Sequence, residues 1–236
     1  MLTSFVLITL VAFDTPTKVE TKPLEQNRTL TCWRYPKLLV KQVDAHEKGA
    51  ARLSFVRFEG LAPACEEALA ASERVLDDWS GYFAGVFGAL VIFDGDDGWN
   101  GGVGFAVYDA TSGKQVLEDA RVGAMSSVKG ALRYRRLVSL DCNASTDATC
   151  ATKAMALTNT KQNLLPLCQK GYAKWLAEFQ AQVAKLPCEG ECLEGRKEQL
   201  DSFRSSNSVL VYEVSVDRAT FAITPQPKQP ECWLQN

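Results

Sequence analysis

Alternation of apolar and polar residues predicts strands along most of the chain. Successive side chains of a strand point to opposite faces, so Leu132 and Tyr134 are expected on one face with Arg133 and Arg135 on the other. The continuous apolar run 85–93 is typical of a strand covered on both faces. Further strands are predicted at 38–43, 53–58, 103–108, 115–118, 209–216 and 219–223, the last two joined by a turn at Asp217-Arg218.

Apolar residues spaced three and four apart predict two amphipathic helices, over 63–79 and 164–186. Pro63 suits the first turn of the first helix. Asn163 can cap the second helix and Pro187 ends it. Aromatic residues recur along one face of the second helix, which indicates a face buried in the core. A third, more charged helix is predicted over 194–205.

These elements together predict an α+β fold. We expect a single domain, with a mainly antiparallel sheet packed by two or three amphipathic helices and stapled by disulfides. A β-sandwich with helical insertions is the alternative. The expected organisation is a signal peptide at 1–12, a flexible lead-in at 13–30 and one domain over 31–236.

The N-terminal segment 2–13 is almost wholly apolar and precedes the first charged residue, Asp14. It is shorter than the roughly 20 residues that a membrane-spanning helix needs. An apolar run of this length is typical of a secretory signal peptide, and a buried N-terminal strand or a membrane anchor are the alternatives. The mature chain is therefore expected to have no transmembrane segment.

The cysteine content points to an oxidising compartment. An even number of cysteines in an exported chain predicts disulfides, although eight cysteines allow roughly a hundred pairings. A bridge between Cys32 and Cys232 is one of them. Zinc is disfavoured because Cys188 and Cys192 have no second pair of matching spacing and the chain has one histidine. The cysteines are Cys32, Cys65, Cys142, Cys150, Cys168, Cys188, Cys192 and Cys232. The proline-rich tail 225–230 is predicted to be an extended arm, held to the body through Cys232.

Composition excludes some classes of function without selecting one. The chain has 236 residues, of which 46% are hydrophobic and 23% charged, as in ordinary globular proteins. Its formal net charge of -2 disfavours general nucleic-acid binding. The single histidine, His46, lies in a polar segment, and no nucleophile elbow or phosphate loop is present. The sequence therefore contains no recognisable catalytic motif.

An acidic, glycine-rich segment at 94–102 is the first candidate site. Asp94, Asp96, Asp97 and Asn100 offer the oxygen ligands that calcium prefers, although their spacing does not follow the helix-loop-helix calcium motif. The simplest interpretation is an acidic hairpin loop whose glycines turn the chain. As a third possibility, such a loop would bind a partner through Trp99.

A second candidate is the basic cluster on the strand predicted around Tyr134. Arg133 and Arg135 are expected to point together towards solvent, where they would hold a carboxylate, sulfate or phosphate. Charges that protect an edge strand from aggregation explain the same residues without a ligand.

The resulting hypothesis is an exported, disulfide-stabilised binding or interaction protein, periplasmic or extracellular. Its partner is an unknown protein or small molecule, and no cofactor or metal is expected. The alternative is a secreted or periplasmic hydrolase that uses paired carboxylates, because glycoside hydrolysis needs only two acids at a set separation.

Overall fold

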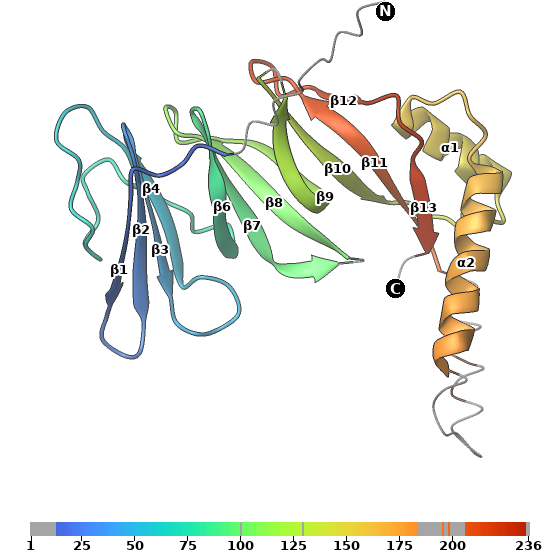
Figure 1. The fold of residues 1–236 in the computed structure, drawn as a ribbon, viewed down its shortest axis with the longest axis horizontal. Helices are drawn as coiled ribbons and strands as arrows, with labels where there is room; N and C mark the ends of the chain where they lie inside the picture. Colours follow the sequence, from blue (N-terminus) through green and yellow to red (C-terminus); the bar gives the residue numbers. More distant parts are fainter. Residues whose placement is uncertain are drawn as a thin grey trace, which may run out of the picture. The chain divides into compact units, whose positions relative to one another are not determined.

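The computed structural model describes residues 13–99, 101–128, 130–183, 195, 198 and 206–234, and it consists mostly of antiparallel sheet (Figure 1). Contacts within the chain define two compact units. Unit 1 takes in the described residues up to Arg121 together with 125–132 and 218–221. Unit 2 takes in the described residues of 122–124, 133–217 and 222–234.

The first sheet has five strands in the order β1-β2-β3-β4-β5, and all neighbouring strands are antiparallel. The strands are β1 (Lys18–Pro23), β2 (Thr29–Tyr35), β3 (Leu38–Asp44), β4 (Arg52–Arg57) and β5 (Arg74–Val75). The segment 13–30, predicted to be a flexible lead-in, thus contains a strand. β1 pairs with β2 along its whole length, from Lys18 opposite Arg34 to Pro23 opposite Thr29.

The second sheet follows the order β12-β11-β10-β9-β8-β7-β6, and β13 also pairs with β11. The strands are β6 (Gly81–Phe87), β7 (Leu90–Trp99), β8 (Gly102–Asp109), β9 (Gln115–Val128), β10 (Ala131–Ser139), β11 (Ser208–Val216), β12 (Ile223–Pro225) and β13 (Glu231–Leu234). Most of the predicted strands are confirmed with bounds that differ by at most one residue, except that the strand predicted at 115–118 extends to Val128 as β9.

Two strand predictions are wrong in their boundaries. The apolar run 85–93 is a hairpin, because Gly88 has a φ of 63° and starts a two-residue loop between Phe87 and Leu90. The turn at Asp217-Arg218 is a longer loop, in which the Asp217 amide donates to Ala222 O at 3.1 Å. Phe221, with a φ of 56°, interrupts the extended backbone, so that β12 begins only at Ile223.

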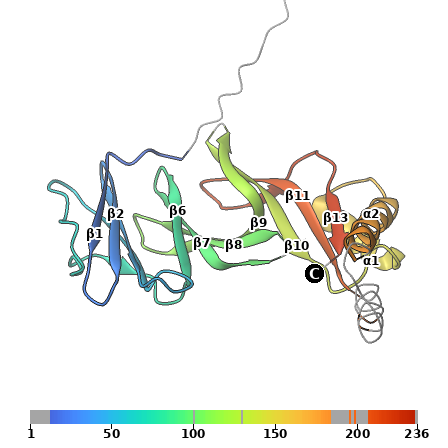
Figure 2. The same ribbon diagram turned by 60° about the horizontal axis from the view of Figure 1, so that its bottom comes forward.

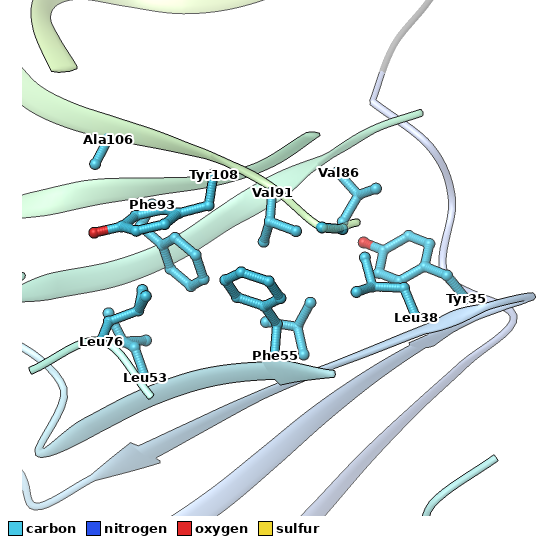
Figure 3. Close-up of a cluster of buried hydrophobic side chains, with 12 residues drawn as sticks. Tyr35, Leu38, Leu53, Phe55, Leu76, Val86, Val91, Phe93, Ala106 and Tyr108 are labelled. Carbon is cyan, nitrogen blue, oxygen red and sulfur yellow. The ribbon is translucent and has the colours of Figure 1, made fainter. Parts of the chain in front are cut away.

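The core of unit 1 lies between the first sheet and strands β6 to β8, whose apolar faces meet (Figure 3). Phe55 of β4 packs against Phe93 and Tyr108, with ring centroids 6.3 Å and 6.0 Å away. Burial raises the pKa of Tyr108 to about 12. Its hydroxyl donates to Gln115 Oε1 at 3.0 Å. The aromatic residues therefore fill the space between the two sheets.

The segment 58–73 covers the other face of the first sheet, and the helix predicted over 63–79 is wrong. This segment consists of bends and turns followed by β5. Its backbone carbonyls accept hydrogen bonds from cationic side chains of the sheet. In a helix these carbonyls would instead accept from the backbone amides four residues later. The donors and acceptors are Lys22 to Cys65 O, Arg34 to Pro63 O, Lys41 to Ala68 O and Arg52 to Glu67 O. Of the apolar residues at helical spacing, Cys65 and Leu76 are buried, whereas Leu69 is 50% exposed, so the spacing does not mark one buried face.

The predicted α+β class is therefore wrong, because the fold is dominated by sheet. In unit 1, sheet and irregular chain cover the faces that helices were expected to cover. The helices α1 (Ala148–Thr158) and α2 (Leu165–Val183) belong to unit 2. α2 confirms the helix predicted over 164–186, and Asn163 Oδ1 accepts from its first residue, Leu165, at 3.0 Å. The helix predicted over 194–205 lies almost wholly outside the described residues.

Three disulfides confirm the expected pairing for six of the cysteines. They join Cys32 to Cys65, Cys142 to Cys150 and Cys168 to Cys232. The Cys32–Cys232 pairing is wrong, because each of these residues has another partner within its own unit. Cys188 and Cys192 lie outside the described residues. No described cysteine is free.

Candidate functional site

The acidic segment 94–102 is mostly strand, not an open loop. β7 continues to Trp99 and β8 begins at Gly102, with an irregular register between Asp94 and Gly98. The three aspartates have separate partners: Asp94 pairs with Arg121 at 2.6 Å, Asp96 accepts from Ser80 at 3.0 Å and Asp97 pairs with Lys48. Within the described residues, no three His, Cys, Asp or Glu side chains gather where they could hold a metal ion. The structure does not bring the calcium candidates together, and Asn100 is outside the described residues.

The other predicted binding residues lie on β7 and β10. The backbone of Trp99 pairs with Gly102 at the end of β7. On β10, Leu132 and Tyr134 are buried, as the alternation predicts, whereas Arg133 and Arg135, which are predicted to point towards solvent, are half-buried. Arg135 forms an ion pair of 2.8 Å with Glu231 of β13. A binding role for these arginines stays a prediction. Glu231, the ion-pair partner of Arg135, lines a groove that the sequence did not indicate.

This groove lies in unit 2 between α2 and the C-terminal tail and has a volume of about 750 Å³. We call it the α2–tail groove. α2 and β13 run beside each other in both ribbon views (Figure 1, Figure 2). Each wall contributes a tryptophan, Trp175 from α2 and Trp233 from β13. Its size lies within the range of small-molecule binding sites, which are mostly apolar with a few polar groups.

A disulfide and a close backbone contact hold the two walls of the α2–tail groove together. The disulfide from Cys168 of α2 to Cys232 of β13 brings their Cα atoms to 4.9 Å. One turn further along α2, a Cβ atom placed on Gly171 would lie 2.1 Å from Cys232 O. Glycine is therefore required there, because the helix and the strand backbone approach more closely than any side chain allows. β13 is in turn held by pairing with β11, where Cys232 lies opposite Leu210.

Among the described residues, one cation of the groove has no ion-pair partner. Lys170, Lys174 and Lys228 line it together with Glu178 and Glu231. Lys228 pairs with Glu213, and Lys174 lies 3.8 Å from Glu178. Among the described residues, no acidic side chain forms an ion pair with Lys170. The groove thus combines aromatic surface with an available ammonium group, which suits an acidic ligand with an apolar body.

The two glutamates do not resemble a hydrolytic pair. Glu178 and Glu231 have side chains that are 61% and 53% exposed, and each faces a cation. The general acid of a glycosidase instead sits in a hydrophobic pocket. The hydrolase alternative therefore finds no support in this groove.

Sequence reasoning named several residues of this site without assembling them. Trp175 was expected on a buried helix face, and Cys232 was expected to hold the tail to the body. The spacing of Lys170 and Lys174 by one helical turn is a signal that places both on one face of α2. That this face lies against Trp233 depends on the Cys168–Cys232 pairing, which the sequence leaves open.

Replacing Gly171 with alanine is expected to destabilise unit 2 by about 1–3 kcal/mol, because the added methyl group overlaps the backbone of β13. This loss would outweigh the roughly 1 kcal/mol by which alanine favours a helix over glycine. Urea unfolding followed by circular dichroism measures the change. The control is Gln169→Ala at an exposed position of the same helix, which should leave stability almost unchanged. A Gly171→Ala variant as stable as this control would contradict the close approach.

None of the described helices is long and apolar enough to cross a membrane. No protein-family model, curated protein or solved structure matches the chain.

Proposed function

We propose that this protein is an exported, disulfide-stabilised binding protein whose α2–tail groove takes a small ligand with an apolar or aromatic body and an acidic group. The observation that carries the proposal is the groove itself, with Trp175 and Trp233 on opposing walls and Lys170 available to an anion. Tryptophan side chains supply large apolar contact areas, and the lysine selects for negative charge.

Export is supported by the disulfides. Disulfides persist in oxidising compartments and are rare in reducing ones. Six described cysteines are paired, and two of the three bridges brace unit 2, which contains the groove. A groove held in this way is preorganised, so that less free energy is lost in ordering its walls when a ligand binds.

A pair of fluorescent probes tests the proposed ligand chemistry. 8-Anilinonaphthalene-1-sulfonate has an aromatic body and a sulfonate, and N-phenyl-1-naphthylamine is its uncharged counterpart. We expect both to bind the folded protein, with Lys170→Ala weakening only the sulfonate, by roughly fivefold. Trp233→Ala should weaken both probes, by roughly tenfold, because the apolar wall is lost. Fluorescence titration gives the dissociation constants.

Lys153→Ala is the matched control for the charge change. Lys153 lies on α1 in the same unit, is 54% exposed and does not line the groove. This variant should bind both probes as the wild type does. Equal loss of sulfonate binding in Lys153→Ala and Lys170→Ala, or unchanged binding of both probes in Trp233→Ala, would refute the assignment of the groove.

A further inference from the structure

A second groove, in unit 1, has a different chemistry. It lies between β4, β5 and the turn that joins β8 to β9, and its volume is about 800 Å³. Three cationic side chains line it: Arg57 from β4, Arg74 from β5 and Lys114 from the turn. Thr111 and Ser112 of the turn add hydroxyl groups. We call it the cationic groove.

The acidic residues of the cationic groove do not neutralise it. Both carboxylate oxygens of Glu73 already accept hydrogen bonds, one from Lys41 at 2.8 Å and the other from Ser54 at 2.6 Å. Asp78 is 62% exposed and lies 3.9 Å from Arg74, beyond hydrogen-bonding distance. An excess of positive charge therefore remains in the groove.

The three cations keep donors for a ligand. Arg57 donates to Thr111 Oγ1 at 3.0 Å, which leaves most of its five N–H groups. Its acidic neighbour Glu59 forms an ion pair of 3.6 Å with Arg57, which is too long for a hydrogen bond. Glu59 also accepts a hydrogen bond from Lys37 at 2.9 Å, and this bond is the main cause that lowers the pKa of Glu59. Within the described part of the chain, Lys114 has no ion-pair partner.

The turn that contributes Lys114 is held in one conformation. Asp109 Oδ1 accepts from the amides of Thr111 and Ser112 at 3.0 Å and 2.7 Å, and the Gly113 amide donates to Asp109 O at 2.8 Å. These backbone amides are therefore not available to an anion, and side chains must bind it. Arg57 links β4 to this turn through Thr111, so that cations from two segments face one space.

From these contacts we infer that the cationic groove binds the oxyanion group of a ligand larger than a bare ion, such as an acidic sugar. Guanidinium groups match the planar geometry of carboxylate, sulfate and phosphate oxygens, and lysine adds a point charge. The volume exceeds what a single oxyanion fills and lies in the range of drug-sized ligands. This site is separate from the α2–tail groove, because all its lining residues belong to unit 1.

Titration of the full chain, followed by the amide NMR signals of residues 111–114, tests the inference. The probes are D-glucuronate, D-glucose 6-phosphate and inorganic sulfate, with uncharged D-glucose as the control ligand. We expect saturable binding of at least one acidic sugar and none of D-glucose. Arg74→Ala and Lys114→Ala should each weaken the acidic sugar by about tenfold. Comparison of the carboxylate with the phosphate ester shows which oxyanion is preferred.

Lys48→Ala is the control for net charge, since Lys48 is 61% exposed and does not line the groove. Melting temperatures confirm that the variants fold, and Lys114→Ala, at an exposed turn position, retains the test if Arg74→Ala does not fold. Three results would overturn the inference: no saturation by either acidic sugar at millimolar concentration, equal weakening in Lys48→Ala, or binding of sulfate as tight as that of the acidic sugars.

Discussion

Replacing Glu73 with alanine is expected to lower the free energy of unfolding of unit 1 by about 3–5 kcal/mol, because it leaves a buried lysine without its counter-ion. The side chains of Lys41 and Glu73 are 2% and 0% exposed, and Lys41 Nζ lies 2.8 Å from Glu73 Oε2. Glu73 also accepts from Ser54 Oγ at 2.6 Å and from the Ala70 amide at 2.9 Å. One carboxylate therefore joins β3, β4 and the segment 58–73.

The appropriate control removes both charges at once. A Lys41→Met, Glu73→Leu double variant fills similar volume without a buried charge, and replacing a buried ion pair in this way is often neutral or stabilising. We expect it to recover most of the stability that Glu73→Ala loses. Urea unfolding monitored by circular dichroism compares the three proteins. A loss below about 1 kcal/mol in Glu73→Ala would instead place this pair in the class of exposed ion pairs.

Sequence patterns predicted well the elements in which the spacing of apolar residues indicates the buried face. The alternation along β10 placed Leu132 and Tyr134 on the buried side. α2 has an apolar stripe and a capping asparagine, and both signals are local. The formation of disulfides could also be expected, because an even number of cysteines after an apolar N-terminal segment predicts disulfides whatever the fold.

Other elements could not be predicted, because their structure is decided by distant groups. The segment 63–79 has helical spacing, but four basic side chains from the sheet compete for its carbonyls. Lys41 interrupts an apolar strand and gives no sign of being buried until Glu73 reaches it from the segment 58–73. α1 was missed because its alanine-rich sequence has no strong apolar stripe, although Asp147 caps it by accepting from the Thr149 amide.

The candidate sites show the same division between local and distant information. Lysines and tryptophans of the α2–tail groove are visible in the sequence, but they come from segments about as far apart as Cys168 and Cys232, which are separated by 64 positions. Arg57, Arg74 and Lys114 are likewise scattered along unit 1. The acidic residues of segment 94–102 form a candidate site in the sequence because they are neighbours along the chain. In the structure, however, the three aspartates have separate partners.

Removal of the Cys168–Cys232 disulfide is expected to destabilise unit 2 by about 4 kcal/mol, because the bridge closes a long loop and so restricts the unfolded chain. The Cys142–Cys150 bridge is the matched control in the same unit. It spans only 8 positions, and its removal should cost about 2.5 kcal/mol on the same chain-entropy argument. Alanine replacement of both cysteines of each pair, followed by urea unfolding, measures the two losses.

The same two variants separate a role in stability from a role in the site. Loss of Cys168–Cys232 frees the tail from α2, so binding of 8-anilinonaphthalene-1-sulfonate should fall by at least about tenfold under conditions where the variant is still folded. The Cys142–Cys150 variant should bind the probe like the wild type, because that bridge joins α1 to the chain before it and does not line the groove. If both variants bind the probe equally well, pairing of β13 with β11 alone holds the tail in place, and the disulfide contributes stability without shaping the α2–tail groove.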